Sequence, residues 1–309
     1  MRRLKALERP PGQGEIWLKD DGVFGEAWGG NKARKLEWIL PDVRRKGRSA
    51  IFTVGALATN HGLATALYAR EQGIRTILAL VDQPLDEHVA RQRARIERSG
   101  ARVYRTHGTF RTIVSLPLIY AANVDWRRLR PPYFLTVGGS SPLGAIGYVD
   151  AALELAGQIE RGELPAPSHV VVALGSGGTA AGLVLGLALA GVDTRVVAVQ
   201  VNDRAPLGAG RIARLAERVR RLLERRGARL PVRAVSAGDL EVETRWLGGG
   251  YGHRTAEGEH AIELAREEGL ALEPVYTGKT MAALLALRER GELGDGPLLY
   301  WHTHNSATS

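Results

Sequence analysis

The sequence predicts an α/β protein of two domains, built on open, mostly parallel β-sheets that helices flank. Apolar runs with strand character recur along the chain and helical patterns separate most of them, which is typical of parallel βαβ units. Runs such as HVVVAL, residues 169–174, are apolar without interruption, so we expect strands that are buried on both faces. A chain of 309 residues also exceeds the usual size of one hydrophobic core, which favours two domains.

The expected strands and helices alternate from one end of the chain to the other. The strands begin at Glu15, Ala50, Thr76, Ala101, Tyr133, His169, Arg195 and Leu298. Helical periodicity predicts helices over residues 61–72, 85–99, 143–161 and 179–190, with a further one from Arg214. Residues 106–132 have a weak pattern and carry RRLRPP, so we expect a loop there, and residues 248–259 are predicted to form a glycine-rich loop.

Domain boundaries are expected where these patterns weaken. We place a small domain at residues 41–144 and a large domain at residues 1–40 together with 145–309. The large domain is therefore expected to contain both ends of the chain.

The net charge of +9, from 42 Lys and Arg against 33 Asp and Glu, raises the question of nucleic-acid binding. The densest basic stretch, RLAERVRRLLERRGARL from Arg214, places arginines between leucines and valines at helical spacing and includes Glu217 and Glu224. This pattern is typical of a solvated arginine face over an apolar stripe. Neither aromatic stacking residues nor zinc-ligand spacing accompanies it, so we expect no nucleic-acid partner. A basic surface still attracts anionic ligands.

Composition also bears on location and chemistry. No apolar run reaches the length of a membrane span, and the basic opening MRRLK is not followed by the apolar segment of a secretory signal, so we expect a cytoplasmic protein. The chain contains no cysteine, which excludes disulfides, thiolate nucleophiles and cysteine-bound metals. We expect no metal site.

One glycine-rich element, LGSGGTAAG, follows the buried strand at 169–174 and opens a helix. Glycines allow the backbone to approach an anion closely, and helix N-terminal amides direct positive partial charge at it, which indicates a phosphate site. Two alternatives stay open on this pattern alone. The loop resembles a dinucleotide fingerprint, with Asp203 as the ribose ligand, and it could also be a tight turn without a ligand.

A second element, WGGNKARKLEWIL, places Lys32 at the start of a helix after two glycines and an asparagine. The positive end of a helix disfavours a charged ammonium group, which makes such a lysine easier to deprotonate and more nucleophilic. A solvated surface charge is the alternative.

A third element, TVGALATNHG, ends a predicted strand and starts a helix. Thr59, Asn60 and the free amides beside them could bind a carboxylate or a ring oxygen. An ordinary helix N-cap is the alternative.

Taken in order, GGNKARKLE, TVGALATNHG, GGSSPLGAIGY, LGSGGTAAG and EPVYTGK resemble the D-cysteine desulfhydrase and 1-aminocyclopropane-1-carboxylate deaminase family, from Glu15 to Tyr300. The resemblance implies the two-domain pyridoxal-phosphate fold type II, which is like tryptophan synthase β, and a homodimer. It implies that Lys32, and not Lys35, holds pyridoxal 5'-phosphate as a Schiff base. Asn60 would then contact the phenolic oxygen of the cofactor. The phosphate would be held by Gly175, Ser176, Gly177, Gly178 and Thr179.

The resemblance also implies β-elimination from a small amino acid, which yields a keto acid, ammonia and the departing group. The implied catalytic residues are Lys32, Thr59, Tyr251 and Tyr276, and the implied substrate contacts are Thr59, Asn60, His61, Ser140 and Tyr276. Without the resemblance, a packing role with a solvated hydroxyl is the favoured interpretation of each tyrosine.

Two threonines point to the desulfhydrase branch. Thr277 and Thr303 stand where the ring-opening deaminases carry a glutamate and a leucine, and a hydroxyl near the ring nitrogen does not force its protonation. D-Cysteine is therefore the expected substrate, which makes sulfide the departing group. 1-Aminocyclopropane-1-carboxylate and other β-substituted amino acids such as cysteate are the alternatives.

The sequence departs from the family pattern at three positions in the site. Thr59 replaces the usual serine, and His304 and Asn305 replace the glycine pair that usually follows the terminal His-Thr. Because the terminal segment HTHNSATS is altered, the interpretation of the protein as a non-catalytic relative that retains the fold stays open. A nucleotide-dependent oxidoreductase is the other remaining class.

Overall fold

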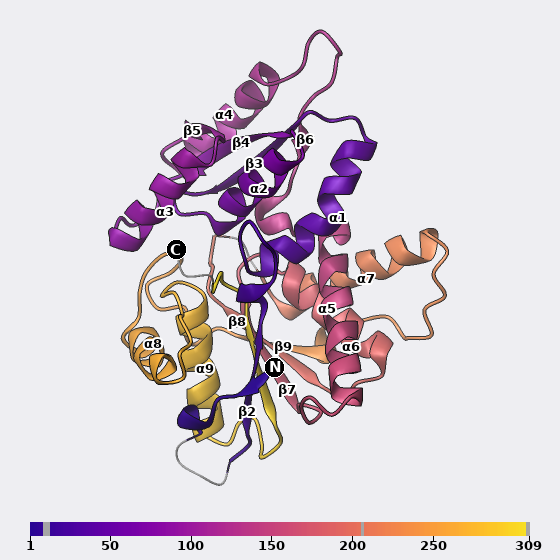
Figure 1. The fold of residues 1–309 in the computed structure, drawn as a ribbon, viewed down its shortest axis with the longest axis vertical. Helices are drawn as coiled ribbons and strands as arrows, with labels where there is room; N and C mark the ends of the chain where they lie inside the picture. Colours follow the sequence, from indigo (N-terminus) through magenta and orange to yellow (C-terminus); the bar gives the residue numbers. More distant parts are fainter. Residues whose placement is uncertain (9–12, 205–206, 307–309) are drawn as a thin grey trace.

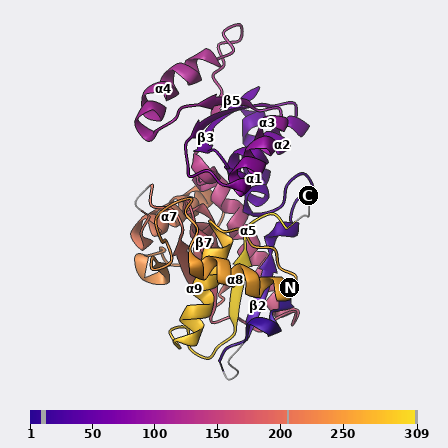
Figure 2. The same cartoon turned by 90° about the vertical axis from the view of Figure 1, so that its left-hand side faces the viewer.

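The structure is a computed structural model that describes residues 1–8, 13–204 and 207–306. These residues form one six-stranded sheet, in the order β1-β2-β10-β7-β8-β9, and one four-stranded sheet, in the order β5-β4-β3-β6. Figure 1 shows the smaller sheet above the larger one, each with helices packed on it, and Figure 2 shows the same division from the side. The predicted α/β fold with mostly parallel sheets flanked by helices is confirmed.

The larger sheet is parallel except for the pairing of its first two strands. Its strands are β1 (Arg2–Arg3), β2 (Ile16–Asp20), β7 (His169–Leu174), β8 (Arg195–Gln200), β9 (Leu240–Glu243) and β10 (Leu298–His302). Successive side chains of a strand point to opposite faces, so a strand between two helix layers must be apolar at every position. Leu299 and Trp301 of β10 pack into one core cluster, while Leu298 and Tyr300 pack into the other. This double burial explains the uninterrupted apolar runs.

Helices cover both faces of the larger sheet. The helices are α5 (Pro142–Glu160), α6 (Gly178–Ala190) and α7 (Ala209–Arg225) on one face, and α8 (Ala256–Glu267) and α9 (Thr277–Glu289) on the other. The close approach of α5 and α6 depends on Gly182, since a Cβ atom there would lie 2.4 Å from both the Ala145 carbonyl oxygen and the Tyr148 Cβ.

The smaller sheet is parallel throughout. Its strands are β3 (Ala50–Ala56), β4 (Arg75–Val81), β5 (Arg102–Arg105) and β6 (Tyr133–Phe134), and its helices are α1 (Asn31–Arg45), α2 (Asn60–Glu71), α3 (Glu87–Arg98) and α4 (Thr109–Ala122). Short 3₁₀ turns occur at η1 (Lys5–Leu7), η2 (Asp21–Val23), η3 (Val137–Gly139) and η4 (Ala237–Asp239). Helix α1 packs against both α2 and α5, so it joins the two halves of the molecule.

The expectation of a loop at residues 106–132 is wrong, because α4 occupies residues 109–122. The helix contains Pro117 and has apolar residues on opposite sides. Leu116 and Ile119 pack against the smaller sheet, whereas Phe110 and Leu118 are exposed. Without one polar face, the sequence lacks the periodicity that identifies a surface helix.

Three smaller differences concern the strands and one loop. The run from Tyr133 forms only the two-residue strand β6, and β1 and β9 were not among the predicted strands. The glycine-rich segment from residue 248 is a loop only as far as Thr255, where α8 is capped. These segments are short, and their conformations depend on neighbours distant in sequence.

The proposed domain boundaries stay a prediction. Helix α1 runs across the boundary at residues 40 and 41, and α5 runs across the boundary at residues 144 and 145. Within the described ranges, no helix combines the length and the apolar character that a bilayer span requires.

Candidate active site

A cavity of about 1030 Å³ lies where the carboxyl ends of strands from both sheets meet. Ligands of open α/β sheets bind at such an edge, because the loops that follow parallel strands converge there. The cavity brings together most of the predicted site residues, namely Lys32, Thr59, Asn60, His61, Ser140, Gly175, Ser176, Gly177, Thr179, Tyr251, Tyr276 and Thr303. Gly178 is not among its lining residues, and neither is Thr277, whose hydroxyl accepts a hydrogen bond from Glu273 N.

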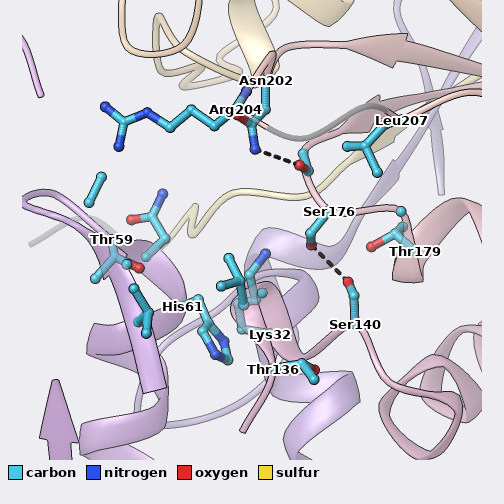
Figure 3. A pocket seen from close by; sticks show the side chains of 18 of the residues that line it. Lys32, Thr59, His61, Thr136, Ser140, Ser176, Thr179, Asn202, Arg204 and Leu207 are labelled. Carbon is cyan, nitrogen blue, oxygen red and sulfur yellow. Dashed lines mark hydrogen bonds between the residues drawn. The ribbon is translucent and has the colours of Figure 1, made fainter. Parts of the chain in front are cut away.

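The glycine-rich loop between β7 and α6 forms one wall. Gly177 lies in the left-handed region with φ 88°, a conformation that side chains disfavour, and its position turns the chain directly into the helix. The amides at the start of α6 are thereby presented to the cavity. Two serine hydroxyls lie beside them, since Ser140 Oγ is 2.7 Å from Ser176 Oγ (Figure 3). Ser140 Oγ also accepts a hydrogen bond from Gly178 N. Backbone amides and hydroxyls at a helix N-terminus are the donors that a phosphate group requires.

Lys32 projects into the cavity from the first turn of α1, and its Nζ lies 2.6 Å from Asn31 Oδ1. Burial lowers the pKa of Lys32 to about 8, against the opposing effect of the Glu273 carboxylate. Asn31 Nδ2 in turn donates to Thr179 Oγ1 of the glycine-rich loop, over 3.1 Å. The lysine is therefore tied to the anion-binding wall and is partly neutral near physiological pH.

Lys35, one helical turn after Lys32, also reaches the cavity wall but is directed elsewhere. Its Nζ lies 3.2 Å from the carbonyl oxygen of Gly138 and 3.5 Å from Ser140 Oγ. Burial, followed by the charge of Lys32, holds the pKa of Lys35 well below its usual value. The buried lysine thus stabilises the turn that carries Ser140 through these contacts.

The opposite wall is formed where β3 leads into α2. Thr59 caps that helix, because its Oγ1 accepts a hydrogen bond from Gly62 N, as the N-cap interpretation expected. Asn60 Oδ1 accepts a hydrogen bond of 2.6 Å from Gln92 Nε2. His61 Nε2 lies 3.3 Å from Thr53 Oγ1, whereas its Nδ1 has no hydrogen-bond partner within the described residues.

That nitrogen is buried without a partner among the described residues, which is unusual for a polar atom. Burial lowers the pKa of His61 well below its usual value, and the neighbouring Lys32 and Lys35 act in the same direction. The ring is therefore neutral at physiological pH and cannot act as a fixed positive charge.

Two tyrosines close a third side of the cavity. The Tyr276 hydroxyl donates to the Tyr251 hydroxyl over 2.8 Å, and burial raises the pKa of both phenols. The Arg204 guanidinium lies over the Tyr251 ring, 5.0 Å from its centroid. Asp203 Oδ1 accepts a hydrogen bond from Tyr251 N, so the carboxylate considered for a ribose instead fixes the tyrosine loop.

Sequence reasoning did not single out Glu273, which also lines the cavity. Its carboxylate accepts hydrogen bonds from Val275 N, Tyr276 N and Thr277 N, and so holds the start of α9. The residue stands at the head of the EPVYTGK motif, which was the available signal. A motif does not show that the Glu273 carboxylate points toward backbone amides.

Taken together, the cavity offers an anion site, a partly neutral lysine, and polar side chains on the facing wall. These groups fit pyridoxal phosphate, which needs a phosphate cradle, an amine for its aldehyde and a hydrogen-bond donor for its phenolic oxygen. The roles of the individual residues remain predictions.

Comparison with known proteins agrees with this fit. Residues 1–304 match the family described as "Pyridoxal-phosphate dependent enzyme". The chain is 35% identical to D-cysteine desulfhydrase of Salmonella paratyphi A over 306 residues, which cover 97% of this chain and 89% of that protein. The same identity holds for D-cysteine desulfhydrase of Salmonella newport over 295 residues, 94% of this chain and 86% of the relative.

Among solved structures, the "ACC deaminase homologue" superposes with a TM-score of 0.82 at 32% identity, over 99% of this chain and 88% of that one. A fungal L-serine ammonia-lyase from Rhizomucor miehei shares the fold, with a TM-score of 0.64 at 19% identity, over 100% of this chain and 93% of that one. The resemblance drawn from the motifs is confirmed, and so is fold type II. The chain belongs to the family of pyridoxal-phosphate dependent enzymes, and pyridoxal phosphate is its cofactor.

Proposed function

We propose that the protein catalyses β-elimination from D-cysteine and releases a keto acid, ammonia and sulfide. The observation that carries this proposal is the position of Lys32, an amine of lowered pKa that shares one cavity with the glycine-rich loop and the tyrosine pair. The D-cysteine desulfhydrases that match over nearly the whole chain support the choice of substrate.

Each wall of the cavity has a separate task in binding. The amides of residues 175–179, with the Thr179 hydroxyl, hold the phosphate at the start of α6. Asn60 donates an amide N–H to the phenolic oxygen from the facing wall. Lys32 forms the covalent bond, for which its neutral amine is required. When bound, pyridoxal phosphate supplies the electron withdrawal that makes the α-proton of an amino acid acidic.

The chain's own groups then move the protons. Lys32 Nζ, once an amino acid has displaced it, is the base that removes the proton at the α-carbon. The phenols of Tyr251 and Tyr276 have raised pKa values, so they stay protonated. The Tyr276 hydroxyl donates its proton to Tyr251, so the Tyr251 hydroxyl is the donor that would meet the departing group. Ser140, His61 and the turn at Thr59 and Asn60 bind the substrate carboxylate. Thr303 lines the same cavity, and its hydroxyl would face the ring nitrogen of the cofactor.

One observation favours a second candidate substrate class. The mouth of the cavity is lined by Arg211, Arg214 and Arg218 of α7, which lie at helical spacing, and by Arg204. Arginines at an entrance attract anions. An amino acid whose β-substituent is anionic, such as cysteate, is therefore the alternative substrate that we propose.

The assembly and the location that we propose are a homodimer and the cytoplasm. Helix α4 exposes Phe110, Val114 and Leu118, and a partner subunit would remove such apolar side chains from water. Sedimentation of the cofactor-loaded protein gives the assembly directly, and a monomer would contradict the proposal.

The experiment that tests the activity is keto-acid release from four substrates side by side: D-cysteine, L-cysteine, cysteate and 1-aminocyclopropane-1-carboxylate. We expect the highest kcat/KM with D-cysteine, together with an equal amount of sulfide. Lys32→Ala should abolish release, whereas Lys46→Ala on the exposed end of α1 should leave it unchanged. Release from none of the four by a cofactor-loaded enzyme would contradict the proposed function and favour the non-catalytic relative.

A further inference from the structure

His304 lies in the active-site wall, at one of the positions where the sequence departs from the pattern of the family that it resembles. It follows β10 and lines the cavity together with Thr303. The backbone around it is held against the turn that precedes Lys32, because Asn31 N donates to the Thr303 carbonyl and Gly29 N donates to Asn305 Oδ1. The imidazole ring is therefore presented to the cavity by a fixed segment.

A chain of hydrogen bonds that starts on α3 fixes the orientation of the groups that His304 meets. Arg95 Nη1 lies 3.4 Å from Gln92 Oε1, and a guanidinium can only donate. The amide oxygen of Gln92 is therefore the end that faces Arg95. The amide nitrogen faces Asn60, and Gln92 Nε2 donates to Asn60 Oδ1 over 2.6 Å.

The orientation of Gln92 determines that of Asn60 and then that of His304. Since Asn60 Oδ1 is the acceptor for Gln92, the Asn60 amide nitrogen faces the imidazole, with Nδ2 3.3 Å from His304 Nδ1. An amide nitrogen donates, so Nδ1 must accept and the ring proton must sit on Nε2. One of the two N–H groups of Asn60 is used in this way. The other has no hydrogen-bond partner in the described part of the chain, and Asn60 lines the cavity.

We propose that His304 is a positioning residue that acts through Asn60, because its Nδ1 holds one amide N–H and thereby aims the other at the phenolic oxygen of bound pyridoxal phosphate. This inference rests on the cofactor contact proposed for Asn60. Glycine at position 304 has no side-chain acceptor, so the orientation of the asparagine would then depend on Gln92 alone.

The arrangement makes the cofactor contact depend on the protonation state of His304. Burial lowers the pKa of His304, so the ring is a neutral acceptor at physiological pH. Protonation at low pH would place an Nδ1–H against the Asn60 N–H and break the contact, which is therefore present above the pKa of His304 and lost below it. The ionisable groups that surround the ring are Glu273, His302, His88, Lys32 and Arg95.

The test compares variants of the cofactor-loaded enzyme through the dissociation constant of pyridoxal phosphate and the pH midpoint of its visible absorption band. His304→Leu removes the acceptor, so we expect roughly fivefold weaker cofactor binding, as for one lost hydrogen bond, and a displaced midpoint. His304→Asn offers Oδ1 near the place of Nδ1 without a titrating ring, and it should restore both values to within about twofold.

A double variant separates positioning from a general structural role. If His304 acts through Asn60, Asn60→Ala/His304→Leu binds the cofactor no more weakly than Asn60→Ala alone. Additive losses, or an unchanged constant and spectrum in His304→Leu, would overturn the inference. These readouts need no turnover. An enzyme that binds the cofactor but releases no keto acid from D-cysteine contradicts the proposed function. The role of His304 can still be tested with that enzyme, because cofactor affinity and the absorption band do not depend on turnover.

Discussion

The hydroxyl of Tyr276 donates a hydrogen bond of 2.8 Å to the hydroxyl of Tyr251, which joins the start of α9 to the loop at residues 248–255. The two rings meet edge to face, with centroids 5.9 Å apart. Each ring therefore restricts the orientation of the other, and the two hydroxyl groups lie together at the cavity.

The tyrosine pair predicts unequal effects of two matched changes. Tyr251→Phe removes the hydroxyl whose proton is free for the substrate, and we expect kcat/KM with D-cysteine to fall about 100-fold, the scale of one positioned proton donor. Tyr276→Phe removes only the group that orients the Tyr251 hydroxyl, and a smaller loss is expected. Steady-state kinetics measures both, with circular dichroism as the control for folding. A larger loss in Tyr276→Phe than in Tyr251→Phe would show that the roles are reversed.

The lowered pKa of Lys32 predicts a pH dependence of cofactor capture. Only the neutral amine attacks the aldehyde, so the rate at which the cofactor-free enzyme binds pyridoxal phosphate should rise with pH and level off above about 8. The Glu273 carboxylate raises the pKa of Lys32, so Glu273→Gln should move the midpoint to lower pH. Stopped-flow absorbance gives the profile, and Glu267→Gln on the exposed face of α8 is the matched control. A midpoint that rises in Glu273→Gln would contradict the assignment.

A buried carboxylate behind the site predicts a large effect on stability. Asp21 is 1% exposed and accepts hydrogen bonds from Arg34 Nε, Tyr148 Oη and Trp301 Nε1, which join α1, α5 and β10. Asp21→Asn removes the buried one of the two carboxylates that pair with the Arg34 guanidinium, so we expect a loss of roughly 3 kcal/mol in the free energy of unfolding.

The control for Asp21 uses the same arginine. Glu154 also pairs with Arg34, but its side chain is 42% exposed, so Glu154→Gln should cost less than about 1 kcal/mol. Urea denaturation measures both variants. Equal losses would show that the burial of Asp21 does not govern the interaction.

Two glycines, both with positive φ but at opposite ends of α6, provide a test of the phosphate-binding loop. Gly177 has φ 88° and precedes α6, whereas Gly191 has φ 67° and follows it, and a Cβ atom would meet nothing closer than 3.8 Å at either position. Alanine at either position should cost on the order of 1 kcal/mol of stability. Only Gly177→Ala should also weaken cofactor binding, by about tenfold. Equal cofactor affinity in the two variants would show that the loop at Gly177 does not bind the phosphate.

The sequence was sufficient where the determinants are local or strongly periodic. The strand at 298–302 is apolar from Leu298 to Trp301 because both faces are covered, and the loops at Lys32, Asn60 and Gly177 each lie at a turn into a helix. The family resemblance assigned these motifs to one site, and the convergence of strand-to-helix turns at one edge of a parallel sheet explains why they meet there.

Contacts between distant segments could not be predicted in this way. The pairing of Asn60 with His304 joins residues 244 positions apart, and neither neighbourhood indicates the other. The helix at 109–122 was missed for a related reason. Its apolar side chains face both the sheet and the exterior, and Pro117 interrupts its pattern.

The central claim is that Lys32 is the lysine that binds pyridoxal phosphate. Borohydride reduction of the cofactor-loaded enzyme, followed by peptide mass spectrometry, tests it most directly, because reduction makes the bond to the lysine permanent. The account predicts a phosphopyridoxyl group on Lys32, with Lys35 unmodified although it lies on the same cavity wall. The group on Lys35, or an unchanged yield of adduct in Lys32→Ala, would contradict it.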